Sequence, residues 1–237
     1  CLRALALQSR IPDEVVVVDN ASSDGSAEIA RVAGARVMTC ASPGIAAASS
    51  TGYDAAIGTC ILRLDADCIP PHDWVQVMLD TFVSRPDVAV LTGGARFIDG
   101  PRPMRRWLAV LYLGGYVVAT APALGHLPLF GSNLGFRRSA WLDVRDRIHR
   151  NPPIHDDLDL AYHFGERHRI RVVRGAAMGI SMRPLVSVRG FARRIDWGMR
   201  TVFMHWPQDF PSVRWVRLGL RRILHRLGVP APGSRCS

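Results

Sequence analysis

Two aspartates at the end of a short apolar run are the residues in this chain best suited to chemistry. The segment ILRLDADC, residues 61–68, is typical of a strand that ends in Asp65 and Asp67. Because side chains alternate between the two faces of a strand, residues two apart project the same way. Paired carboxylates can hold a hard divalent cation, Mg²⁺ or Mn²⁺, together with substrate phosphates. The pair therefore suggests chemistry on a nucleotide diphosphate, while a solvated strand end is the plainer interpretation.

A regular alternation of strands and helices is expected to position these carboxylates. The pattern predicts strands over residues 14–19, 35–39, 60–64 and 88–92, and helices over residues 1–8, 26–32, 44–58 and 71–82. This order predicts an α/β fold, with an open, mostly parallel sheet and helices on both faces. The four consecutive valines before Asp19 are typical of a strand buried on both faces.

A third carboxylate is expected at the same edge of the sheet. Asp19 follows its own predicted strand directly, as Asp65 and Asp67 follow theirs. Ligands of open α/β sheets bind at the carboxyl ends of the strands. The convergence of three acids at one edge is stronger evidence for a site than any one of them.

Two later segments add candidate site residues. In the segment Gly131-Ser132-Asn133, two polar residues follow a glycine. Glycine permits close approach of the backbone to a ligand. Asp156 and Asp157 begin a predicted helix, where an acid can cap the helix N-terminus or act as a general base. A plain turn and a plain helix cap stay open as alternatives for these two segments.

The charge of the chain is concentrated in its last third. The 237 residues carry a formal net charge of +10, with arginine as the sole basic residue besides histidine. Residues 1–162 have a net charge of −2 and residues 163–237 a net charge of +12. The last third is therefore expected to meet an anionic surface. The five cysteines are scattered without metal-ligand spacing, which is typical of a reducing compartment, so we expect a cytoplasmic protein.

Two apolar segments raise the question of a membrane. Residues 107–124 form an uncharged stretch long enough to span a bilayer. A span there would separate Asp65 from Asp157, so we expect a buried or interfacial helix. Residues 213–229 have apolar residues at helical spacing and five arginines between them. This pattern predicts either a basic amphipathic helix on the inner face of the cell membrane or a helix packed on the domain. These arginines are Arg214, Arg217, Arg221, Arg222 and Arg226.

The order of these motifs resembles the family 2 glycosyltransferases of the GT-A fold. The matching stretches are VVVVDNASSDGS, GIAAASSTGYDAAIG, ILRLDADCIPPHDW, VLTGG, GSNLGFRRSAW and HDDLDLAY, in the family's order over about residues 1–165. The resemblance implies a GT-A domain over residues 1–185 and a basic helical extension over residues 186–237. It also implies that the family's first strand precedes residue 1 and is missing from this chain.

The resemblance assigns roles to the candidate residues. It implies that Asp67 binds Mg²⁺ or Mn²⁺, that Asp19 contacts the nucleobase and that Asp65 lies near the ribose. The implied donor and nucleotide contacts are Asp19, Ser22, Asp24, Asp65 and Ala66. The implied pocket for the donor sugar and the acceptor is lined by Gly131, Ser132, Asn133 and Asp156.

The resemblance also implies a reaction. Asp157 would take the proton of an acceptor hydroxyl as that oxygen attacks the sugar of a nucleotide-diphosphate donor, with inversion of configuration. The signature of processive synthases is absent, because Pro211 stands where it requires glutamine, so a single addition is expected. The acceptor would be a sugar, a lipid-linked molecule or a cell-envelope glycan. Two other classes stay open: a nucleotidyltransferase, and a noncatalytic module that binds a membrane or a nucleic acid through the basic tail. The acidic sheet edge argues against nucleic acid.

Overall fold

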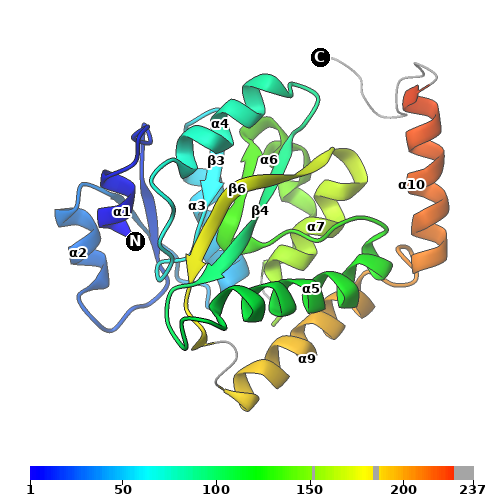
Figure 1. Cartoon of the computed structure of the whole chain (residues 1–237). Coiled ribbons are helices and arrows are strands. Elements are labelled where there is room, and N and C mark those ends of the chain that lie inside the picture. Colours follow the sequence, from blue (N-terminus) through cyan, green and yellow to red (C-terminus); the bar gives the residue numbers. More distant parts are fainter. Residues whose placement is uncertain (151–152, 184–186, 227–237) are drawn as a thin grey trace.

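The chain folds into a mixed α/β structure, which the computed structural model describes for residues 1–150, 153–183 and 187–226 (Figure 1). The strands are β1 (Val16–Asp19), β2 (Arg36–Thr39), β3 (Cys60–Arg63), β4 (Val90–Phe97), β5 (Leu134–Arg137) and β6 (Ile170–Ile180). The helices of the first part are α1 (Leu2–Ala6), α2 (Ser26–Val32), α3 (Ile45–Ala55), α4 (Trp74–Ser84) and α5 (Arg105–Leu124). They are followed by α6 (Arg138–Val144), α7 (Asp156–Arg167), α9 (Val188–Met204) and α10 (Pro211–Arg226), with short 3₁₀ turns η1 (Gly131–Asn133) and η2 (Arg145–Arg147).

The strands form two separate sheets. One contains β1 and β2, which pair in parallel with Val16 opposite Arg36. The other has the order β3-β5-β4-β6, in which β5 is antiparallel to both neighbours and β4 is parallel to β6. Since β3, β4 and β6 therefore run in one direction, the prediction of a mostly parallel sheet is confirmed. The strand β5, which reverses direction between β3 and β4, was not among the predicted strands.

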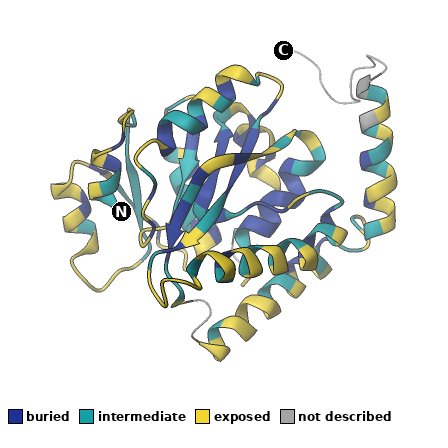
Figure 2. Ribbon diagram, viewed as in Figure 1, coloured by how far each residue is buried: buried dark blue, intermediate teal, exposed yellow. Residues whose placement is uncertain are grey.

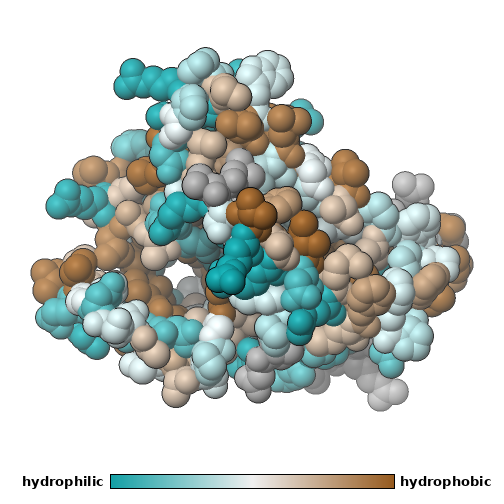
Figure 3. Space-filling model, turned by 90° about the horizontal axis from the view of Figure 1, so that it is seen from below, coloured by the Kyte–Doolittle hydropathy of each residue, from teal (hydrophilic) through white to brown (hydrophobic). Residues whose placement is uncertain are grey.

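An open gap separates the two sheets. Among the described strands, none pairs with the free edge of β1 or with the free edge of β3. Figure 3 shows an opening through the molecule between the side that carries α1 and α2 and the rest. The two sheets are therefore not joined by any described strand. This separation explains why the valines of β1 are only half-buried, where full burial on both faces was predicted.

The larger sheet separates two apolar clusters. Successive residues of β4 face opposite sides, with Val90 in one cluster and Leu91 in the other. The first cluster holds side chains of α6 and α7, including Trp141, and the second holds side chains of α4, including Met78. On β5, a Cβ atom at Gly135 would lie 2.8 Å from Leu62 Cδ2 of β3 and 3.3 Å from Met78 Cε of α4, so glycine permits both side chains to pack closely there.

Helix α5 lies across the body of the domain with several large apolar side chains exposed and few buried (Figure 2). Among the described residues it is the one helix long and apolar enough to cross a membrane. Its contacts are with β4, α7 and α10, while Trp107, Leu111 and Val118 are each about 70% exposed or more. A buried helix was one of the two expectations for this segment, and that option is wrong.

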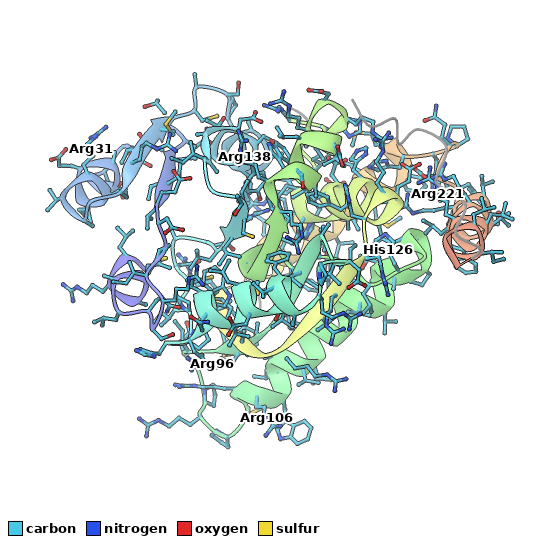
Figure 4. All side chains as sticks on the ribbon, turned by 90° about the horizontal axis from the view of Figure 1, so that it is seen from above. Arg31, Arg96, Arg106, His126, Arg138 and Arg221 are labelled. Carbon is cyan, nitrogen blue, oxygen red and sulfur yellow. The ribbon has the colours of Figure 1, made fainter. Side chains whose placement is uncertain are left out.

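Helix α10 turns its arginines toward the domain and its apolar side chains outward. Arg214 is fully buried, and Arg217 and Arg221 pair with Glu166 of α7. Figure 4 shows Arg221 where α10 meets the body of the protein. The prediction that these three arginines form a free basic face is therefore corrected, because buried carbonyls and carboxylates bind them. The side chains of Arg222 and Arg226, residues 227–229 and the boundary predicted at residue 185 lie outside the described residues.

Candidate active site

A cavity of about 1240 Å³ opens between the two sheets and brings together most of the predicted site residues. The loop after β3, the turn η1 and the first turn of α7 each contribute to its wall. The predicted residues that line it are Asp65, Ala66, Asp67, Gly131, Ser132, Asp156 and Asp157. The structure therefore places acids from segments about 90 residues apart around one space.

Asp65 and Asp67 lie in a turn after the strand, because β3 ends at Arg63. The N–H of Cys68 donates to the carbonyl of Asp65 at 3.0 Å, which closes this turn. The two carboxylates converge through the turn, and the predicted strand alternation does not apply to them. Both side chains are about half exposed, with 47% of each accessible.

The carboxylates of this turn fit a divalent cation. Ligand atoms of Asp65, Asp67 and Cys68 all lie within 4.8 Å of one another. Burial raises the pKa of the Cys68 thiol to about 12, so this thiol stays protonated and the carboxylate oxygens are the available ligands. Ser132 Oγ donates to Asp65 Oδ2 at 2.5 Å, and the guanidinium of Arg183 is paired with Asp67. Arg183 must release Asp67 before an ion can use that oxygen.

Asp157 is buried and held on both carboxylate oxygens. The Gly131 N–H donates to its Oδ2 at 2.9 Å, and the ring of His155 is paired with its Oδ1. Burial raises the pKa of Asp157, but the charges of His155 and Arg63 and the Gly131 hydrogen bond outweigh this effect and bring the pKa to about 2. Asp157 is therefore ionised at neutral pH.

Asp156 lies in a different electrostatic environment from its neighbour. Its Oδ2 is 2.6 Å from Nη1 of Arg63. Burial raises the pKa of Asp156, an effect that the Arg63 charge partly offsets. Arg63 also lies 3.9 Å from Asp65, so this one guanidinium connects the turn after β3 with α7. Sequence reasoning missed Arg63, although its position two residues before Asp65 could have drawn attention to it.

Residues of α5 and α9 complete the wall behind Asp157. The ring of Tyr116 stacks on His155 with a centroid distance of 5.5 Å, and the His155 N–H donates to Thr201 Oγ1 at 2.9 Å. Burial lowers the pKa of His155, but the charge of Asp157 outweighs it and the pKa is raised overall. No sequence signal linked Thr201 to this site, because 44 residues separate it from Asp157.

Some predicted residues lie elsewhere. Asp19, Ser22 and Asp24 are outside the wall of the cavity: Asp19 Oδ1 accepts the Ser22 N–H at 3.0 Å, and Asp24 caps the start of α2 through Ser26. Asn133, predicted in the sugar pocket, is fully buried. Its amide bonds Trp74 and the carbonyls of Gly94 and Ala176, so its role in this structure is to join β4, β6 and α4.

Known proteins resemble this chain in sequence and in fold. The model of the family described as Glycosyl transferase family 2 matches residues 1–143. Glycosyltransferase AglE of Haloferax volcanii is 32% identical over 105 residues, which cover 41% of this chain and 34% of that protein. The matched stretch thus spans about a third of the length of that relative.

Solved structures that are similar in fold include complexes of one glycosyl-transferring synthase. Glucosyl-3-phosphoglycerate synthase from Mycobacterium tuberculosis, in complex with Mn²⁺, uridine diphosphate and glucosyl-3-phosphoglycerate, has a TM-score of 0.58 and 18% identity and covers 98% of this chain and 75% of its own. The same enzyme with Mg²⁺ and uridine diphosphate has a TM-score of 0.57 and 19% identity, with the same coverage. These identities show the fold alone.

The family match covers more than half of the chain and includes the turn after β3 and the turn η1. It decides against a nucleotidyltransferase and against a noncatalytic binding module, the two other classes that the sequence left open. The mixed sheet and the acid-lined cavity agree with this assignment, and the protein belongs to glycosyl transferase family 2.

Proposed function

We propose that this protein transfers one sugar from a nucleotide-diphosphate donor to an acceptor hydroxyl, with inversion at the anomeric carbon. The observation that carries the proposal is the convergence of Asp65, Asp67 and Asp157 on one cavity. The similar structures, which contain uridine diphosphate with Mn²⁺ or Mg²⁺, support a donor of this class. Asp19, Ser22 and Asp24 stay predicted nucleotide contacts, since each lies within two residues of Asn20 or Ser26, which do line the cavity.

Asp67 is the proposed metal ligand, with Asp65 beside it near the ribose. A bound Mg²⁺ or Mn²⁺ would neutralise the charge that develops on the leaving diphosphate. Ser132 orients Asp65 through the hydrogen bond from its hydroxyl. Once displaced from Asp67, the guanidinium of Arg183 can pair with a phosphate of the donor, so that its charge again has an anionic partner.

Asp157 is the proposed general base. The Gly131 N–H and the His155 ring fix both oxygens of its carboxylate, which keeps it ionised and limits its rotation. An acceptor hydroxyl that enters the cavity opposite the leaving diphosphate can donate its proton to this carboxylate as it attacks. A single displacement of this kind inverts the configuration of the sugar.

Substitution of the base tests this mechanism. We expect Asp157→Asn to lower kcat by about 10²- to 10⁴-fold, the usual contribution of a general base, while donor affinity changes little. Asp146→Asn is the control, because the Asp146 side chain is 88% exposed and outside the cavity. Full turnover by Asp157→Asn, with the same folded spectrum as the wild type, would remove Asp157 from the mechanism.

Metal dependence has its own experiment. Calorimetry with uridine, guanosine or thymidine diphosphate sugars, with and without Mn²⁺, should show metal-dependent binding in the wild type and none in Asp67→Ala. A parallel screen of donor hydrolysis identifies the nucleotide and the sugar. Equal binding with and without the ion would contradict the metal role of Asp67.

We also propose that the exposed apolar side chains of α9 and α10 lie against an anionic bilayer, which places a lipid-linked acceptor near the site. On α9 they include Phe191, Ile195, Met199 and Phe203, and on α10 they include Val213, Val216, Leu220 and Ile223. Exposed basic side chains of α9, including Arg193, accompany them. This composition suits the boundary between headgroups and acyl chains.

Vesicle sedimentation tests the membrane proposal. The wild type should sediment with vesicles of anionic lipid, and Val216→Asp with Leu220→Asp should sediment less, since both positions are more than half exposed. Val83→Asp on α4 is the matched control, because Val83 is 81% exposed on another helix. Equal sedimentation of the three proteins would show that this surface meets something other than a membrane.

A further inference from the structure

A second group of metal-ligating side chains lies outside the active-site cavity. It consists of His149, Asp159, His163 and His205, which we call the histidine cluster. None of the four lines the cavity between the sheets. His149 precedes α7, Asp159 and His163 lie one turn apart on α7, and His205 directly follows α9. The cluster therefore joins three segments at the back of the site.

The cluster is centred on one oxygen of a buried carboxylate. Asp159 Oδ1 lies 2.8 Å from His149 Nδ1, 2.9 Å from His205 Nε2 and 3.5 Å from His163 Nε2. The other oxygen, Oδ2, accepts the His149 N–H at 3.1 Å. One carboxylate oxygen thus faces three imidazole nitrogens, while the second oxygen is held by the backbone.

One of these nitrogens lacks a hydrogen bond. His163 is more than nine-tenths buried, and its Nε2 has no hydrogen-bond partner among the described residues. A buried polar atom without a partner costs free energy, and a cation bound between the four ligands would satisfy it. A network of hydrogen bonds alone accounts for His149 and His205 but leaves this nitrogen with only the long 3.5 Å approach to Asp159 Oδ1.

The distances suit a tetrahedral ion after small shifts. Tetrahedral zinc, at about 2.0–2.2 Å from nitrogen and oxygen ligands, sets these ligands about 3.4 Å apart. The four ligand atoms already lie within 4.8 Å of one another, so each needs to move by less than about 1 Å. Three imidazoles and one carboxylate, without a thiolate, are a ligand set that Zn²⁺ accepts.

We propose that the histidine cluster binds Zn²⁺ as a structural ion that fastens α7 to the end of α9. The surroundings of His205 support a fixed ligand: its ring stacks on Tyr162 at 4.0 Å, and its Nδ1 faces Asp209 Oδ2 at 3.7 Å. The His149 side chain is 38% exposed, which gives the ion a path from solvent. Four protein ligands close the coordination sphere, as in structural rather than catalytic zinc sites.

This ion would hold His155 and Asp157 in place by fixing α7 against α9, outside the cavity. Asp159 lies two residues after Asp157 on α7, and α9 supplies Thr201, whose hydroxyl binds the backbone of His155. A zinc ion that fixes the contact between α7 and α9 would therefore hold His155 and Asp157 in register with the cavity. The proposal does not depend on the donor or the acceptor of the transferase.

Zinc retention by the purified chain tests the proposal. The wild type, after removal of metals and incubation with Zn²⁺, should retain one zinc per chain after dialysis, as measured by elemental analysis. Asp67→Ala should retain the same amount, which separates this ion from the cation at Asp65 and Asp67. His72→Gln, at an exposed histidine outside the cluster, is the matched control, and His163→Gln should lose the zinc.

Thermal unfolding and a spectroscopic probe complete the test. At zinc concentrations about 100 times Kd, the melting temperature of the wild type should rise by about 5–10 °C and that of His163→Gln should not. Co²⁺ in place of Zn²⁺ should give the d–d bands of a tetrahedral ion, which serves even if His163→Gln fails to fold. A wild type that retains no zinc, or shows no tetrahedral cobalt spectrum, overturns the proposal.

Discussion

Replacement of Arg214 by methionine should destabilise this protein far more than its place in a basic amphipathic helix suggests. Its guanidinium is fully buried and donates to the carbonyl of Leu124 at 2.6 Å, to the carbonyl of Tyr162 at 2.8 Å and to Asp209 Oδ1 at 3.0 Å. It also lies 4.8 Å from the centre of the Tyr162 ring. These contacts fasten α10 to α5 and α7.

The magnitude follows from these contacts. Hydrogen bonds of a charged group contribute about 1.5–3 kcal/mol each, and their loss leaves two buried carbonyls unpaired. The buried apolar side chain of methionine offsets part of this loss of free energy. Asp209 also keeps Arg217 as a partner. We therefore expect a loss of about 3–5 kcal/mol in the free energy of unfolding, the usual cost of breaking a buried ion pair.

Urea and thermal unfolding measure this effect. A loss of that size lowers the melting temperature by about 6–20 °C in a domain of this length. Arg200→Met is the matched control, because Arg200 makes an exposed pair with Asp196 worth about 0.3–0.5 kcal/mol. If Arg214→Met and Arg200→Met unfold within about 1 kcal/mol of each other, Arg214 does not anchor α10 and our account of this helix fails.

Three further predictions follow from the contacts at the site. Arg183→Ala should tighten Mn²⁺ binding by up to about fivefold in calorimetry without donor, because it frees Asp67 from an exposed ion pair worth at most about 1 kcal/mol; weaker binding would contradict this. The kcat should stay level as the pH falls to about 4, because Asp157, with a pKa of about 2, must be ionised to accept a proton; a loss of kcat within this range would instead implicate Asp156, whose pKa burial raises. Gly135→Ala should lower the free energy of unfolding by about 1–3 kcal/mol, because its Cβ would lie 2.8 Å from Leu62 Cδ2 on β3 and 3.3 Å from Met78 Cε on α4; unchanged unfolding in urea would show that these side chains move aside without cost.

The local pattern of the sequence was sufficient for the framework of the site. Runs such as the valines before Asp19 and the apolar residues before Asp65 predicted strands, and the turn residues after them predicted loops. Since the carboxyl ends of parallel strands meet at one edge, the prediction that acids gather there needed no tertiary information. The cavity brings together Asp65 and Asp67 of that prediction, whereas Asp19 lies outside its wall and Asp157 joins the two from the start of α7.

Partners far apart in the chain could not be predicted in this way. Arg63 lies 93 residues from Asp156, and Thr201 lies 46 residues from His155, so no local spacing connects them. Asn133 has the polarity of a pocket residue, but its three amide hydrogen bonds join strands and a helix in the core. A side chain of this kind is assigned to the core or to a pocket only once its partners are placed.

Helix α10 shows the division between sequence and tertiary structure most clearly. The periodicity of Val216 and Leu220 against Arg214 and Arg217 determined that this segment is a helix with two unlike faces. Which face points inward was decided by tertiary structure, because the Tyr162 carbonyl, Asp209 and Glu166 offer acceptors at the interface that the arginines bind. The apolar face was left outside, since the hydrogen bonds and ion pairs of the arginines hold the helix to the domain, and periodicity alone carries no information about such partners.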